Sequence, residues 1–259
     1  MVKLKKFHIF ILITTSFFFI FAGLGYSFRL DKSIIIELDQ NKIINSNFYG
    51  FGAETLPWLW TKENLKQGIN ENDIKLNFGR IREIELPLTR IFVPWEIWNP
   101  AADYKTFTFD SDGMQSLCKT LDIYQGMGTR VIIVTVDWLR DSPWYDVKKS
   151  SGAVLKLLEC LVKRKGYSCI HFWTLTNEPE LTYGWLKKIP FKNYIQIHKL
   201  VKEGLKEKKI PIEIIGSDDI ESKSWFKDSV EFLFDLADVF SSHMYLYPDE
   251  IESISTFCK

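Results

Sequence analysis

The sequence has few cysteines and no excess of charge of either sign. Four cysteines in 259 residues are too few for a fold that depends mainly on disulfides. The chain carries 33 basic and 33 acidic side chains, so its formal net charge is zero. This balance gives no electrostatic reason for nucleic acid as a partner, and we expect none.

The four cysteines also lack the spacing of a metal site. No CxxC pair is present, and no histidine lies at zinc-binding spacing from Cys118, Cys160, Cys169 or Cys258. Free buried thiols are the favoured state, and a Cys160–Cys169 disulfide is the alternative. We expect neither a metal ion nor a cofactor.

The N-terminus has the pattern of an export signal. Lys3, Lys5 and Lys6 precede an apolar run over residues 7–24. The pattern predicts a signal peptide or signal anchor in residues 1–30 and a folded domain in residues 31–259. The run is long enough to span a bilayer, so membrane anchoring through it is the alternative to cleavage. In both cases the chain is expected to be secreted or on the outer face of the cytoplasmic membrane.

Apolar segments with strand character alternate with segments of helical periodicity along the rest of the chain. The expected strands are 48–53, 88–94, 130–136, 169–176, 210–216 and 239–244. The expected helices are 71–85, 111–127, 150–165, 191–208 and 222–235. Runs such as VIIVTV are apolar on both faces, which is typical of a parallel sheet. The alternation therefore predicts an α/β fold.

Polar side chains at the carboxyl ends of the expected strands favour a (β/α)8 TIM-barrel type over an open doubly wound sheet. They are Glu54, Trp95 and Glu96, Asp137 and Trp138, Asn177 and Glu178, Asp218 and Asp219, and His243 and Tyr245. In a barrel these ends converge on the face where barrel enzymes have their active sites. No GxGxxG turn follows the first strand, as many open dinucleotide-binding sheets would have.

The segment HFWTLTNEPE is the strongest indication of function. An apolar strand leads directly into Asn177, Glu178 and Pro179. Burial at the mouth of an apolar barrel favours the protonated form of a carboxyl group, and a proton donor to a glycosidic oxygen needs that form. Asn177 beside it can hydrogen-bond a sugar hydroxyl, and proline ends the strand pairing.

These residues resemble those of the retaining glycoside hydrolases of clan A, eight-fold barrels typified by families 5, 30 and 39. In that clan Asn-Glu, often Asn-Glu-Pro, stands at the end of strand four, as Asn177, Glu178 and Pro179 do here. Arg90 in TRIFVPW is similar to the arginine of strand two. His243-Met244-Tyr245 is similar to the His-x-Tyr of strand six.

The resemblance implies a role for each matching residue. Glu178 would be the general acid/base, Asn177 would orient a sugar hydroxyl, and Arg90, His243 and Tyr245 would support the nucleophile. Further candidates for sugar binding are Glu54, Trp58, Trp95, Trp138 and Tyr245. For any single tryptophan of this set, packing is a commoner role than a sugar platform. The implied substrate is an extracellular β-linked glycoside or polysaccharide, cleaved at its O-glycosyl bond.

The sequence departs from the clan after the sixth strand. The clan nucleophile is a glutamate at the end of strand seven, and this chain ends at Lys259. Two more units would need about 60–100 residues, so we expect an incomplete barrel of about six units without that nucleophile. A separate C-terminal barrel fragment is a candidate partner.

Three alternatives stay open from the sequence. The chain could be a catalytically inactive carbohydrate-binding relic. It could act as an inverting enzyme in which Asp137 or Glu54 positions a water, or as a metal-assisted hydrolase that uses Asp137, Asp218 or His243.

Overall fold

The computed structural model describes residues 48–101, 103–136, 146–181, 189–220 and 222–245. The predicted targeting segment lies outside these residues, as do Asp137, Trp138 and Cys258. The described residues from Tyr49 onward belong to one compact unit. None of the helices in the described part of the chain combines the length and the apolar character that crossing a bilayer requires.

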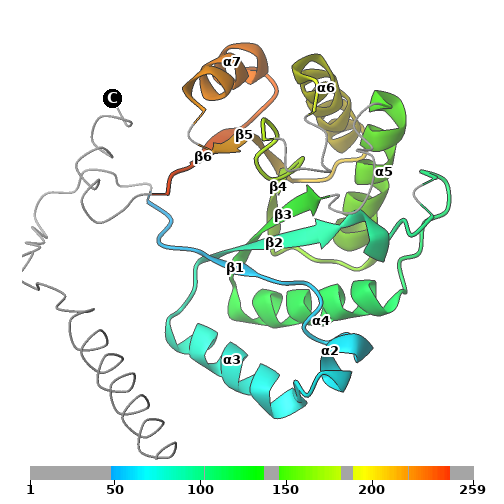
Figure 1. Cartoon of the computed structure of the whole chain (residues 1–259), viewed down its shortest axis with the longest axis vertical. Helices are drawn as coiled ribbons and strands as arrows, with labels where there is room; N and C mark the ends of the chain where they lie inside the picture. The colour runs from blue at the N-terminus through cyan, green and yellow to red at the C-terminus, as the bar shows by residue number, and fades with distance from the viewer. Residues whose placement is uncertain (1–47, 102, 137–145, 182–188, 221, 246–259) are drawn as a thin grey trace, which may run out of the picture. The chain divides into compact units, whose positions relative to one another are not determined.

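One sheet of six parallel strands forms the centre of this unit (Figure 1). The strands are β1 Ala53–Thr55, β2 Leu88–Pro94, β3 Arg130–Val136, β4 Ile170–Thr174, β5 Glu213–Ile220 and β6 Val239–His243. Each pairs with the next along the chain, so among the described strands β1 and β6 are the outermost two. This is an incomplete barrel of the TIM type, which confirms the predicted α/β class and the six-unit arrangement.

Helices connect the parallel strands and cover one face of the sheet (Figure 1). They are α2 Lys62–Lys66, α3 Glu71–Glu83, α4 Asp112–Met127, α5 Val147–Glu159, α6 Phe191–Glu207 and α7 Lys223–Leu233. A 3-10 turn, Trp95–Ile97, follows β2, and a π-helical turn, Cys160–Arg164, continues α5. Local capping defines several ends: Asn70 and Asp73 form a capping box on α3, and Gly128 ends α4 with a φ of 72°.

Two apolar clusters lie on opposite faces of the sheet. Alternate residues of a strand point to opposite faces, so Ile91 and Val93 of β2 join the large core between sheet and helices. Phe92, between them, belongs instead to a small cluster with Val134 and Val136 of β3. Arg90 shares the face of Phe92 by the same alternation, and its guanidinium lies 4.8 Å from the Phe92 ring centroid.

The predicted bounds hold for some strands and fail for others. β2 and β3 have the predicted bounds. The expectation for the first strand is wrong: β1 spans Ala53–Thr55, so Glu54 lies within the strand. The fifth strand runs on to Ile220, because buried polar residues continue its pairing with β6 after the apolar run ends.

The cysteines in the described segments are free thiols. Cys118, Cys160 and Cys169 are unpaired with one another, so the alternative of a Cys160–Cys169 disulfide is wrong. Burial raises the pKa of the Cys169 thiol to about 11. Such a thiol is chemically inert at neutral pH, which fits a packing role.

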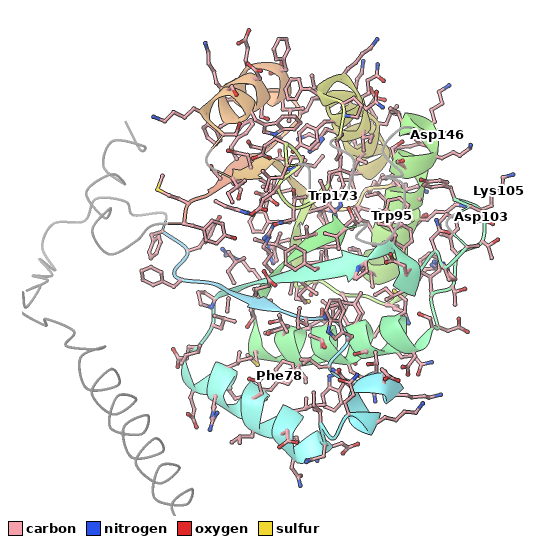
Figure 2. The ribbon with its side chains drawn as sticks, viewed as in Figure 1. Phe78, Trp95, Asp103, Lys105, Asp146 and Trp173 are labelled. Atoms are coloured by element: carbon pink, nitrogen blue, oxygen red, sulfur yellow. The ribbon has the colours of Figure 1, made fainter. Side chains whose placement is uncertain are left out.

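A buried histidine in the core makes the stability of the fold depend on pH. His198 of α6 is fully buried and packs against Tyr194 and against Trp173, which Figure 2 labels in the core. Its Nδ1 lies 2.8 Å from the Tyr194 carbonyl oxygen. Burial lowers the pKa of His198 from 6.5 to about 4. Between these values the unfolded chain binds a proton that the folded chain excludes. The contribution to stability is therefore complete above pH 6.5 and is lost as the pH falls toward 4.

We expect the His198→Gln variant to have a flatter dependence of unfolding free energy on pH than the wild type. Between pH 7.5 and pH 4, the wild type should lose about 3 kcal/mol more unfolding free energy than the variant. Each unit of pKa difference between the folded and unfolded chain corresponds to about 1.4 kcal/mol. Urea unfolding between pH 7.5 and 4 measures it. Val201→Ala, in the same helix and core, should lower stability equally at both pH values. Parallel curves for wild type and His198→Gln would contradict the prediction.

Candidate active site

Glu178 lies just beyond the carboxyl end of β4 and is 4% exposed. Its φ is 46°, a left-handed conformation that is uncommon for residues other than glycine. The Glu178 N–H donates to the Asp218 carbonyl oxygen at 2.9 Å, which holds this conformation against β5. Backbone strain of this kind gathers at functional sites, and here it turns the side chain toward β6.

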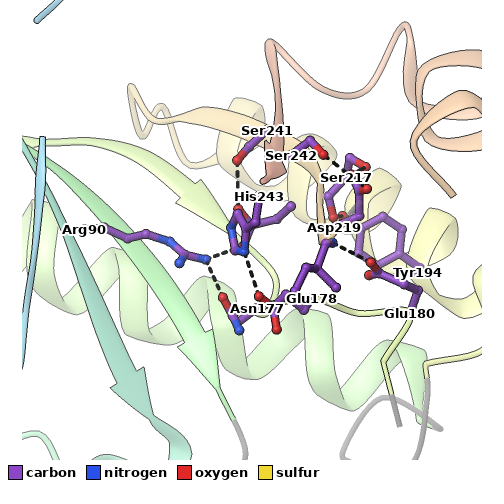
Figure 3. Close-up of polar contacts among 12 residues, drawn as sticks. Arg90, Asn177, Glu178, Glu180, Tyr194, Ser217, Asp219, Ser241, Ser242 and His243 are labelled. Atoms are coloured by element: carbon purple, nitrogen blue, oxygen red, sulfur yellow. Dashed lines mark hydrogen bonds and ion pairs between the residues drawn. The ribbon is translucent and has the colours of Figure 1, made fainter. Parts of the chain in front are cut away.

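Arg90 joins β2 to the two neighbouring strand ends. Its Nη2 donates to Asn177 Oδ1 at 3.0 Å and to Asp218 Oδ2 at 2.5 Å. Figure 3 shows the side chain reaching across from its strand toward Asn177 and His243. The Arg90 side chain is 19% exposed and that of Asp218 is 3% exposed. The ion pair is thus largely shielded from water, where hydrogen bonds to charged groups are strong.

A β-bulge in β5 aims Asp218 at this arginine. Ser217 pairs with Ser241 and Asp219 pairs with Ser242, so Asp218 is the extra residue between them. Ser217 and Asp218 both have left-handed backbone conformations, with φ values of 67° and 56°. The Tyr194 hydroxyl supports the bulge by donating to the Ser217 carbonyl oxygen at 3.0 Å.

His243, the last residue of β6, lies between two carboxyl groups (Figure 3). Its Nδ1 is 2.9 Å from Glu178 Oε1, and its Nε2 is 3.3 Å from Asp218 Oδ1. Burial by itself would lower the pKa of His243. The hydrogen bond and charge of Asp218, together with the bond to Glu178, outweigh burial and the opposing charge of Arg90, so the pKa lies above its ordinary value.

Two further carboxyl groups stabilise the segments around the site. Asp219 lies next to the bulge in β5, and Glu180 lies in the loop after β4. Asp219 accepts hydrogen bonds from the Ser217 and Ser242 hydroxyls at 2.6 and 3.2 Å and from the Ser222 N–H at 3.1 Å. Glu180 Oε1 accepts from the Ile220 N–H at 2.5 Å, and burial raises the pKa of Glu180. Both side chains tie loop segments to β5.

The structure brings four of the predicted site residues together and separates others from them. Arg90, Asn177, Glu178 and His243 belong to one hydrogen-bonded group through Asp218. The expectation that Trp95 is a sugar platform is wrong, because its ring is 4% exposed and packs in the core against Trp98 and Tyr104. Figure 2 labels its position at the end of β2.

The remaining candidates lie nearer the rim. Glu54 is exposed on β1 and pairs in register with Arg90, Trp58 is half-buried, and Tyr245 is 67% exposed after β6. Trp138 lies outside the described residues. The contacts of these four residues with a sugar stay predictions.

Asp218 is a site residue that was not among the sugar-site candidates predicted from the sequence. The sequence shows Asp218 and Asp219 side by side at the end of an apolar strand. Which way each side chain points depends on the bulge, which the sequence pattern does not reveal. Asp218 faces the cations Arg90 and His243, and Asp219 faces hydroxyl and N–H groups. Within the described segments, no three His, Cys, Asp or Glu side chains converge so that they could hold a metal ion.

Comparison with solved structures relates this fold to glycoside hydrolases. A family 39 glycoside hydrolase from the gut symbiont Bacteroides cellulosilyticus WH2 is 18% identical, with a TM-score of 0.53 over 76% of this chain and 38% of that chain. A glucosidase from Croceicoccus marinus is 12% identical, with a TM-score of 0.54 over 74% and 43%. An endo-β1,6-glucanase is 13% identical, with a TM-score of 0.59 over 80% and 54%.

These likenesses establish a shared fold. The chain spans 38% to 54% of the length of the three solved structures. Comparison with protein-family models gave no match. Comparison with curated protein sequences also gave none. The fold is therefore similar to part of the barrel in these glycoside hydrolases.

Proposed function

We propose that the chain forms the acid/base part of a site that hydrolyses the O-glycosyl bond of a β-linked glycoside or polysaccharide. The observation that carries the proposal is the position of Glu178. Its buried carboxyl group stands at the carboxyl end of β4, beside Asn177 and 2.9 Å from a ring nitrogen of His243. A proton donor to a leaving oxygen needs such a shielded position and a nearby partner for proton exchange.

A retaining mechanism needs a second carboxyl group about 5–5.5 Å from the first. The described residues include no seventh strand that would carry the clan's nucleophile. We propose that a further barrel segment supplies it, either in a longer form of the protein or as a separate C-terminal fragment. Export of the chain and its action outside the membrane belong to the same proposal.

The second candidate function is carbohydrate binding without turnover. The observation that favours it is the presence of polar and aromatic groups at the strand ends, which can contact a sugar without a second carboxyl group. Arg90, Asn177 and the exposed Glu54 and Tyr245 would still offer polar and aromatic groups to a sugar.

One experiment distinguishes the two functions. The full chain is incubated, alone and together with the further barrel segment proposed to supply the second carboxyl group, with matched β-linked and α-linked oligosaccharides of glucose, xylose and mannose. New reducing ends report hydrolysis, and titration calorimetry reports binding. Hydrolysis confined to a β-linked substrate would support the first proposal, and binding without new reducing ends in both preparations would favour the second. Cleavage of only α-linked substrates, or neither binding nor cleavage, would overturn the β-glycosidase proposal.

A further inference from the structure

We propose that Asp218 is a positioning residue that keeps His243 protonated between two carboxyl groups and thereby sets the orientation and proton supply of Glu178. The proposal rests on the proposed function, in which Glu178 exchanges a proton with the substrate. It goes beyond that function because it assigns a role to a residue of β5.

The two contacts of His243 favour its protonated form when Glu178 and Asp218 are both ionised. A neutral imidazole has one N–H, so it can donate to only one of two carboxylates and turns a lone pair toward the other. An imidazolium donates from both ring nitrogens. Here Nδ1 faces Glu178 Oε1 at 2.9 Å and Nε2 faces Asp218 Oδ1 at 3.3 Å, so when both carboxyl groups are ionised only the cation satisfies both.

Asp218 is the fixed member of the pair. Its Oδ1 also accepts from the Ser241 hydroxyl at 3.0 Å, and its Oδ2 accepts from Arg90 Nη2 at 2.5 Å. The bulge and the left-handed φ of 56° place its backbone. With partners on β2 and β6, Asp218 holds the His243 ring in one plane, and the other ring nitrogen is then directed at Glu178.

When both carboxyl groups are ionised, the charges around His243 balance only if the ring is protonated. The charged groups that face it are Arg90 on β2, Glu178 after β4 and Asp218 on β5, and its own strand adds the neutral Ser241 hydroxyl. The positive charges of Arg90 and the protonated ring then face the negative charges of Glu178 and Asp218. The raised pKa of His243 agrees with this arrangement.

The same contact provides a route for a proton. When His243 passes its proton to Glu178, the Nδ1–H bond breaks as the Oε1–H bond forms, which leaves a neutral imidazole and a neutral carboxylic acid. Asp218 then remains paired with Arg90, so no unpaired charge is left in the buried group. Glu178 in its acid form can donate to a leaving oxygen.

The test is a titration of the His243 ring nitrogens by NMR in the full chain labelled with 15N-histidine. The sequence has four histidines, and the signal lost in His243→Gln identifies the right one. In the wild type both ring nitrogens should be protonated at pH 7, with a midpoint above 6.5. Asp218→Asn should lower the midpoint by about one pH unit or more, a tenfold change in proton affinity.

Asp219→Asn is the matched control, because Asp219 is adjacent, equally buried and directed away from the ring. It should leave the midpoint unchanged. Equal shifts in the two variants, or a neutral His243 ring at pH 7 in the wild type, would overturn the proposal. The wild-type measurement decides even if Asp218→Asn does not fold. Since no substrate is used, failure here is separate from failure of the proposed hydrolysis.

Discussion

In the barrel completed by the proposed further segment, the Glu178→Gln variant is expected to lose about 100-fold to 10,000-fold of kcat/KM for a β-linked oligosaccharide, the usual size of a general acid contribution. Glutamine keeps the shape of the side chain but has no carboxyl proton to give. Without a proton, a sugar has to leave as an alkoxide, which is a poor leaving group. An aryl glycoside with an acidic phenol needs no such help in bond cleavage, so its first step should be much less affected.

The measurement compares initial rates of reducing-end release with rates of phenol release for the wild type and the variant. Glu180→Gln is the matched control, because Glu180 lies two residues further on and its carboxyl group accepts from the Ile220 N–H. Its activity should stay within a few-fold of the wild type. Equal losses on both substrate types, or an equal loss in Glu180→Gln, would contradict the assignment of Glu178 as the acid.

Replacement of Arg90 by methionine is expected to lower the free energy of unfolding by about 3 kcal/mol. Removing one partner of a buried ion pair typically costs about 3–5 kcal/mol, because the other charge is left desolvated. Methionine keeps the apolar stem that packs near Phe92, so the loss should reflect the guanidinium. We expect the lower end of the range, since His243 still contacts Asp218.

Urea unfolding of the full chain measures this effect. The exposed Arg82 of α3 provides the control, and Arg82→Met should change stability by at most about 0.5 kcal/mol. The double variant Arg90→Met with Asp218→Asn should be more stable than the sum of the two single changes predicts, because the unpaired charge is gone. Simple additivity of the two changes would show that the ion pair does not carry the effect.

The site and the fold depend on each other through the same residues. Arg90, Asp218 and His243 come from three strands, and their contacts join β2, β5 and β6 on the face of the sheet away from the helices. The small apolar cluster around Phe92 lies on that face as well. Loss of a charged member should therefore be visible both in stability and in the titration of His243.

Local sequence patterns predicted much of this architecture. The apolar runs of β2 and β3, the helical periodicity and the Asn-Glu-Pro segment are each complete within a few residues of chain. They led to the six-strand α/β barrel and placed Glu178 at a strand end. Arg90 and His243 were found through their resemblance to a family pattern, and the structure places both beside Glu178 or its partner Asp218.

The sequence by itself determined the order of strands and helices and the chemical groups at the strand ends, because periodicity and capping act over short distances along the chain. Only the tertiary structure decided that β5 continues through a bulge, that Asp218 faces Arg90 and His243, and that Trp95 is buried in the core. These outcomes depend on partners that lie 23 to 128 positions away in the chain, or on packing within the core. The physical reason is that burial and pairing of polar groups are settled by the whole sheet, after the strands have come together.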